Sequence, residues 1–168
     1  EAYTCLLSAD KKQLYISLWG KDQLLIWDTE TKQSTKKLAI GDNPNELLLT
    51  KNGSYLYVAN ANDNSVAVVD TKTLNIVEVL NCALFANAPN GSTTNGLALN
   101  ENHLLASTSY GEIVKLNTKD GTIIWKKNIE APVQGAPSIF NNFVYQMTVV
   151  NELFVIDINT GKEAWRYD

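Results

Sequence analysis

The sequence predicts an all-β protein whose 168 residues form four four-stranded blades of a β-propeller. The first observation is a repeat. An apolar run that ends in Asp or Asn occurs four times, at steps of 42, 47 and 40 residues: Asp28, Asp70, Asn117 and Asp157. The second observation is that each repeat holds four short stretches rich in Val, Ile, Leu, Tyr and Thr, without a helical period. Four short antiparallel strands in about forty residues are typical of a propeller blade.

The strands of each unit are separated by turn residues, mainly Asn, Gly, Asp and Lys. The first unit supplies YTCLLS, QLYISL, QLLIWD and QSTKKLAI, and the second supplies NELLLT, YLYVAN, SVAVVD and NIVEVLN. The third supplies NGLALN, HLLASTS, EIVKLN and TIIWKKNI, and the fourth GAPSIF, FVYQMTV, ELFVID and KEAWRYD. We therefore expect sixteen strands in one propeller domain.

The predicted blades cover residues 1–41, 42–93, 94–129 and 130–168. The longest step contains an insertion over residues 84–93, whose Pro, Gly, Asn and Ser indicate a loop. Four blades are either half of an eight-bladed ring or a fragment of another propeller.

The repeated Asp or Asn is expected to cap the turn between the third and fourth strands. Its side-chain oxygen can accept backbone N–H groups two residues further on, and Asn does this without a charge. Calcium binding by DTETK or DINTG is the alternative, but neither supplies enough carboxylates at the spacing of a calcium loop. We therefore expect structural caps and no metal site.

Tryptophan stands eight residues after the cap in the last two units, at Trp125 and Trp165. Both lie on the predicted outermost strand, so we expect them to pack between neighbouring blades, with ligand stacking as the alternative. The first two units carry Lys36 and Glu78 at this position. The type of blade therefore changes between the second and third units.

The loops between the second and third strands of each unit are expected to meet at one rim of the propeller. Their polar and aromatic residues form a candidate binding surface, with ordinary solvated turns as the alternative: Trp19, Asn62, Asp63, Tyr110 and Asn151. No catalytic residue is predicted. The single histidine, His103, has no partner histidine, and Cys5 and Cys82 lack metal-binding spacing.

Residues 3–100 resemble YVTN-type propeller repeats, as seen in IGDNPNELLLTKNGSYLYVANANDNSVAVVDTKT. The segment ALFANAPNGSTTNGLALN looks like an insertion of phosphoesterase-associated YVTN propellers. Residues 104–168 instead resemble PQQ-type, BamB-like repeats, as seen in YGEIVKLNTKDGTIIWKKNIEAPVQGAPSIFNNFVYQMTVVNELFVIDINTGKEAWRYD. Two repeat types in one chain suggest a chimera, that is, an engineered or recombined propeller, joined within TNGLALNENHLLAS, with a natural hybrid as the alternative.

The resemblance implies a non-catalytic scaffold or protein-binding module in the periplasm or another extracytoplasmic compartment, although the chain contains no signal peptide. The alternatives are a fragment of a PQQ-dependent quinoprotein dehydrogenase or of a phosphoesterase-associated YVTN propeller. The adjacent cysteines of many quinoprotein dehydrogenases are not present, and neither is a phosphoesterase motif. We expect no cofactor.

Composition limits the partners. The net charge is −4 and the charges are scattered, which argues against nucleic acid, and no apolar run approaches the about 20 residues of a membrane span. An open half-ring would expose an apolar blade face, so we expect a two-fold homodimer that completes eight blades, with Trp165 at the interface. A closed four-bladed monomer or a fragment of a longer chain is the alternative.

Overall fold

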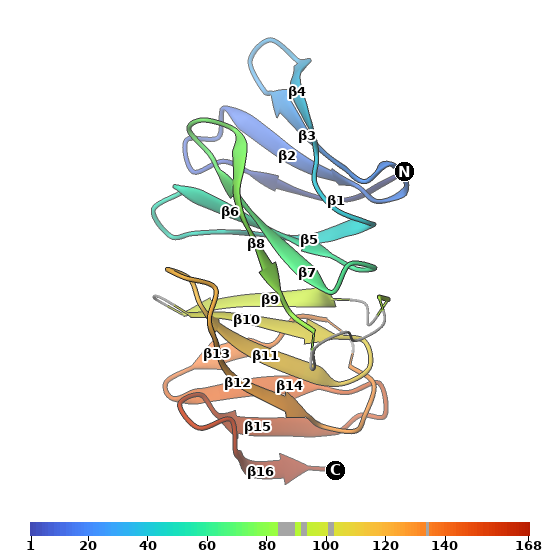
Figure 1. Ribbon diagram of the computed structural model, residues 1–168, viewed down its shortest axis with the longest axis vertical. Coiled ribbons are helices and arrows are strands. Elements are labelled where there is room, and N and C mark those ends of the chain that lie inside the picture. The colour runs from blue at the N-terminus through green and yellow to red at the C-terminus, as the bar shows by residue number, and fades with distance from the viewer. Residues whose placement is uncertain (84–89, 92–93, 101–102, 134) are drawn as a thin grey trace.

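A computed structural model describes residues 1–83, 90–91, 94–100, 103–133 and 135–168. Over these residues the chain forms sixteen strands in four antiparallel sheets, each with its strands in chain order (Figure 1). The predicted all-β fold of four four-stranded propeller blades is therefore confirmed. Of the expected insertion, residues 84–89 and 92–93 lie outside the described part of the chain.

The four sheets are numbered as blades 1 to 4. Blade 1 contains β1 (Ala2–Leu7), β2 (Gln13–Leu18), β3 (Gln23–Asp28) and β4 (Gln33–Ala39), with a turn of 3-10 helix, η1 (Trp19–Lys21), after β2. Blade 2 contains β5 (Pro44–Leu49), β6 (Tyr55–Asn60), β7 (Ser65–Asp70) and β8 (Asn75–Asn81). Blade 3 contains β9 (Thr94–Asn100), β10 (His103–Thr108), β11 (Glu112–Asn117) and β12 (Ile123–Asn128). Blade 4 contains β13 (Ser138–Phe140), β14 (Phe143–Met147), β15 (Leu153–Asp157) and β16 (Glu163–Tyr167).

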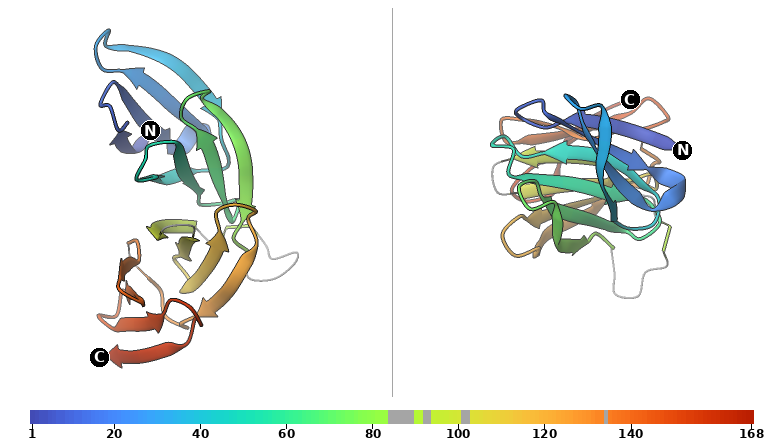
Figure 2. Two further views of the ribbon diagram at one scale, coloured as in Figure 1. Left: turned by 90° about the vertical axis from the view of Figure 1, so that its left-hand side faces the viewer. Right: turned by 90° about the horizontal axis from the view of Figure 1, so that it is seen from above.

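The blades follow one another around an incomplete ring. The first strands of consecutive blades contact each other, β1 with β5, β5 with β9 and β9 with β13, so these strands lie on the inner side. Figure 2 shows an open arc with blade 1 and blade 4 at its opposite ends. The chain therefore forms part of a propeller ring rather than a closed four-bladed ring.

Apolar side chains fill the three spaces between consecutive blades. Tyr15 and Leu24 of blade 1 pack with Leu56 of blade 2, and separate apolar clusters join blade 2 to blade 3 and blade 3 to blade 4. In blade 2, β6 and β7 are buried at five of their six positions, because a blade packs on each side. Side chains alternate between the two faces of a strand, so burial at successive positions requires two covered faces.

The end blades are covered on one face only. In β3 the buried positions alternate with half-buried ones, and all five residues of β16 are exposed. Their outward positions are nevertheless apolar. The outward side chains of blade 1 include Leu7, Leu14, Ile16, Leu25 and Trp27, and those of blade 4 include Phe140, Tyr145, Met147, Leu153, Trp165 and Tyr167.

Candidate functional site

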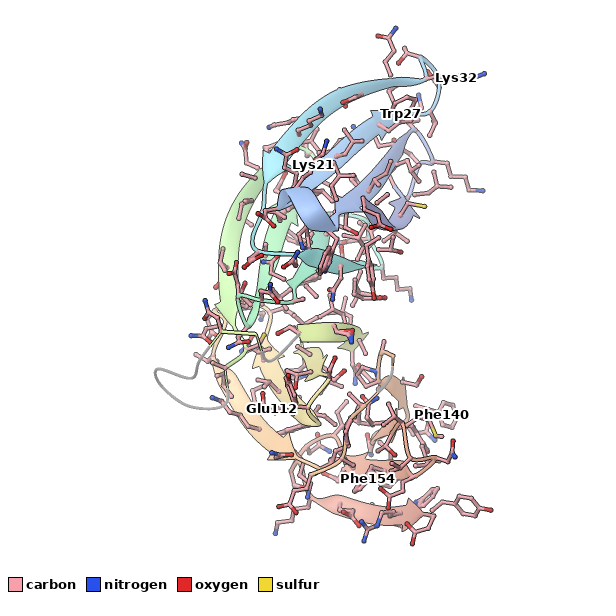
Figure 3. All side chains as sticks on the ribbon, turned by 90° about the vertical axis from the view of Figure 1, so that its right-hand side faces the viewer. Lys21, Trp27, Lys32, Glu112, Phe140 and Phe154 are labelled. Atoms are coloured by element: carbon pink, nitrogen blue, oxygen red, sulfur yellow. The ribbon has the colours of Figure 1, made fainter. Side chains whose placement is uncertain are left out.

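The candidate site is the rim predicted from the sequence. In an up-and-down blade, the loops between the second and third strands lie on the same side as the connections between blades. Trp19 lies in η1, Asn62 and Asp63 lie between β6 and β7, Tyr110 follows β10, and Asn151 lies between β14 and β15. Figure 3 views the molecule from this side, with η1 in front.

The polar rim residues hold the connection between blades 1 and 2. The amide of Asn62 donates a hydrogen bond to the side-chain oxygen of Asn43, whose own amide donates to the carbonyl oxygen of Trp19 at 2.9 Å. The backbone N–H of Asp42 donates to Oδ2 of Asp63 at 2.7 Å. These contacts make Asn62 and Asp63 part of the loop framework.

Apolar side chains of the rim loops project into solvent. Trp19 is 43% exposed and Tyr110 is 64% exposed, while Val149 and Val150 at the tip of the β14–β15 turn are about equally open. Asn151 has a left-handed backbone, with φ 68°, and completes that turn. Sequence reasoning missed the two valines, although an apolar pair at a hairpin tip is itself unusual. The rim therefore offers an apolar surface on blades 1, 3 and 4.

The turn caps lie on the opposite side of the blades. Oδ1 of Asp28 accepts the backbone N–H groups of Glu30 at 2.9 Å and Thr31 at 2.7 Å. Asp70 and Asp157 accept the equivalent pairs, and Asn117 accepts the N–H of Lys119 at 2.9 Å.

These hydrogen bonds lower the carboxyl pKa values of the three aspartate caps. The N–H donor three residues after each aspartate, a threonine in all three turns, is the largest cause of a lowered carboxyl pKa. Among the described residues, no group of three or more His, Cys, Asp or Glu side chains is placed to hold a metal ion.

The residue eight positions after the cap reaches the next blade. Nε1 of Trp125 donates to the carbonyl oxygen of Ile158 at 2.8 Å, and Nζ of the buried Lys115 donates to the same oxygen at 2.9 Å. The indole ring also lies against Gly161, where a Cβ atom would stand 2.8 Å from a ring carbon. Gly161 has φ 69°, so glycine suits both the turn and the ring.

The same position behaves differently in the other blades. Nζ of Lys36 donates to the carbonyl oxygen of Leu74 at 2.6 Å. Glu78 lies beside Gly121, where a Cβ atom would stand 2.9 Å from Oε1 of the glutamate. Trp165 lies in blade 4, the last of the four blades described here, and is 49% exposed.

A cleft lies between blades 2 and 3 on the side of the turn caps. Its volume is about 990 Å³, and its lining includes Tyr55, Tyr57, Glu78, Leu99, Thr118 and Lys119. Burial raises the pKa of the Tyr57 hydroxyl. Glu78, which stands at the position that Trp125 has in blade 3, lines this cleft.

The two cysteines do not form a disulfide. Cys5 is exposed and Cys82 is buried, and both are free thiols. Burial raises the pKa of Cys82 to about 12, so its thiol stays protonated at neutral pH. In the part of the chain that the structure describes, no helix is long and apolar enough to cross a membrane.

Comparison with known families separates the two halves of the chain. The family described as outer membrane protein assembly factor BamB matches residues 83–168, about half of the chain. The chain belongs to the BamB family. The family described as lactonase, 7-bladed β-propeller, matches residues 4–78. The predicted BamB-like character of the second half is therefore confirmed, and the first half matches a propeller family of a different type.

Solved structures share the fold. Hydrazine synthase of Kuenenia stuttgartiensis superposes with a TM-score of 0.81 at 19% identity, over 98% of this chain and 48% of that chain. BamB of Moraxella catarrhalis superposes with a TM-score of 0.75 at 14% identity, over 97% of this chain and 47% of that chain. The BamB-like chain thus spans about half the length of both. No curated protein sequence matches it.

Proposed function

We propose that this BamB-like chain is a non-catalytic propeller module that binds a protein through its rim in an extracytoplasmic compartment. The observation that carries the proposal is the exposure of Trp19, Tyr110 and Val150 on loops held by hydrogen bonds. Aromatic side chains on a rigid frame favour protein binding, because they bury a large area with little loss of conformational freedom. The family description, an outer membrane protein assembly factor, supports both the compartment and the class of partner.

A non-catalytic role is also consistent with the lowered carboxyl pKa values in this chain. The lowered pKa values of Asp28, Asp70 and Asp157 have a structural cause in their turns. Hydrolysis of a lactone is the second candidate, favoured by the lactonase match over residues 4–78. Turnover of a simple γ-lactone by the purified chain would support this second function instead.

The experiment uses a urea-unfolded outer-membrane β-barrel protein, labelled with a fluorophore and diluted into buffer containing the chain. Fluorescence anisotropy gives the dissociation constant. We expect the double variant W19A/Y110A to bind about tenfold more weakly or worse, as expected for loss of central aromatic contacts. Tyr55→Ala is the matched control, because Tyr55 is an exposed aromatic residue on the opposite side. Equal weakening by both variants, or no binding by the wild-type chain, would contradict the proposal.

A further inference from the structure

The cleft between blades 2 and 3 has the size and the lining of a small-molecule site. Its volume of about 990 Å³ lies at the upper end of the range of ligand pockets, about 300–1,000 Å³. Tyr57 and Val68 line it and are almost fully buried, so they form its floor. Tyr55 also lines the cleft and is 41% exposed, so its ring lies at the edge. The cleft therefore offers aromatic and apolar contacts to an organic molecule.

The charged side chains of the lining are mainly cations. Among the lining residues that the structure describes, Lys51 and Lys119 are positive and Glu78 is negative, which leaves a net charge of +1. Lys51 lies in the β5–β6 turn of blade 2 and Lys119 in the β11–β12 turn of blade 3, so each wall of the cleft carries a cation. Neither lysine forms a salt bridge within the described part of the chain. In a protein with a net charge of −4, this local excess of positive charge favours an anion.

Asn52 adds a hydrogen-bond donor to the same lining. Its Oδ1 accepts the hydroxyl of Thr50 at 2.8 Å and the backbone N–H of Ser54 at 3.1 Å. The side-chain oxygen is thus used inside the β5–β6 turn, which leaves the Nδ2 amide, a pure donor, for other partners. An amide donor that follows a lysine in the same turn suits the oxygens of a carboxylate.

The same turn in blade 1 shows that the fold does not require these two residues. Asp10 takes the place of Asn52, since its Oδ1 accepts the hydroxyl of Ser8 at 2.7 Å and the backbone N–H two residues further on at 3.1 Å. Ala9 precedes Asp10 where Lys51 precedes Asn52. A carboxylate therefore holds this turn as well as an amide does. The positive, donor-rich version in blade 2 is explained by the cleft that it lines and not by the turn.

We propose that this cleft is a binding site for a small aromatic carboxylate. The planar body of the ligand packs against the two tyrosine rings, and its carboxylate contacts Lys51, Asn52 and Lys119. A single negative charge matches the net charge of the lining, whereas a phosphate monoester, with about −2 at neutral pH, would exceed it. The cleft lies on the side of the turn caps, so the proposal does not depend on protein binding at the rim.

The test compares two ligands that differ only in charge. One is 2-naphthylacetate, which has a planar apolar body and one carboxylate, and the other is its neutral amide, 2-naphthylacetamide. Titration of the whole chain, followed in ¹H–¹⁵N correlation spectra at low ionic strength, gives both dissociation constants and the location of binding. We expect the acid to bind about fivefold more tightly than the amide, or better. The largest shifts should fall on residues 50–57, 99–100 and 118–119.

The variant K51A/N52D gives blade 2 the turn residues of blade 1 and keeps the hydrogen bonds of the turn. It should bind the acid about tenfold more weakly and the amide as the wild type does. Lys162→Glu is the matched control, because it makes the same change in net charge at an exposed lysine of blade 4. It should leave binding of the acid unchanged, and circular dichroism checks that both variants are folded.

Four results would overturn the proposal. The wild-type chain would bind neither ligand, or it would bind the acid and the amide with equal affinity. The shifts would centre on another part of the molecule, or the two variants would weaken binding of the acid equally.

Discussion

The interface between blades 3 and 4 and the interface between blades 2 and 3 differ at the residue eight positions after the cap. Trp125 fills the first interface, where it donates to Ile158 and lies against Gly161. Glu78 occupies the equivalent place in the second interface, beside Gly121, and a cleft of about 990 Å³ lies there. At both interfaces the residue eight positions after one cap meets the glycine four positions after the next.

The cleft coincides with the change of repeat type. Glu78 is the last residue of the lactonase match, whereas Gly121 lies within the BamB match over residues 83–168. A glycine suited to a tryptophan of its own family therefore faces a glutamate of the other. Because blades contact mainly their neighbours, the mismatch stays local and the fold is retained.

The largest expected effect is a difference in stability between variants of Trp125 and Trp165. Trp125→Ala should reduce the free energy of unfolding by about 3 kcal/mol, because it opens a cavity between two blades and removes a hydrogen bond. Trp165→Ala should cost about 1 kcal/mol or less, because that ring is about half exposed among residues 1–168. Urea unfolding followed by circular dichroism measures both. Equal losses would mean that Trp125 does not join the blades.

Filling the cleft is a smaller effect and sharpens the same comparison. Glu78→Trp should raise the free energy of unfolding by about 1 kcal/mol, because Gly121 has no side chain to oppose the ring and the ring would fill part of the cleft that Glu78 lines. Lys36→Trp is the control and should destabilise, since Leu74 carries a side chain where Gly121 has none. If both variants shift the urea midpoint in the same direction, then Gly121 does not determine whether a tryptophan is accepted at the facing position.

The smallest expected effect is on the stability of the chain at acidic pH. The carboxyl pKa of Asp157 is lower in the folded chain than its ordinary value of 3.8, so its contribution to stability is complete above that pH. It is lost as the pH falls from 3.8 through the folded pKa. Asp157→Asn should therefore flatten the decline in melting temperature between about pH 5 and pH 2, and Asn117→Asp should steepen it. Unchanged slopes in both variants would remove the caps as a cause of acid sensitivity.

Much of the fold could be predicted because the signals were local. The repeated cap acts on N–H groups two and three residues away, as at Asp28, and strand alternation is visible within six residues. The spacing from Asn117 to Trp125 likewise lies within one turn and one strand. These features need no knowledge of which blade follows.

The features that could not be predicted depend on contacts between blades, and the sequence of a single strand does not indicate these contacts. Asn62 resembled a free loop residue, yet its amide is used by Asn43 of the neighbouring connection. The cleft beside Glu78 lies between two blades, and its lining comes from both of them. The exposure of Val149 and Val150 depends on their position at a turn tip, which an alternating apolar pattern does not distinguish from a strand.

The most direct test of the tryptophan–glycine match is a double-mutant cycle on Trp125 and Gly161. Gly161→Ala adds a Cβ atom at φ 69° that would stand 2.8 Å from the indole ring. In the wild-type background it should cost about 2 kcal/mol or more, the left-handed strain and the collision together. In the Trp125→Ala background only the strain remains, so urea unfolding should give a coupling energy of about 1 kcal/mol between the two positions. Additive losses, with no coupling, would contradict the claim that these two residues set the fit between blades.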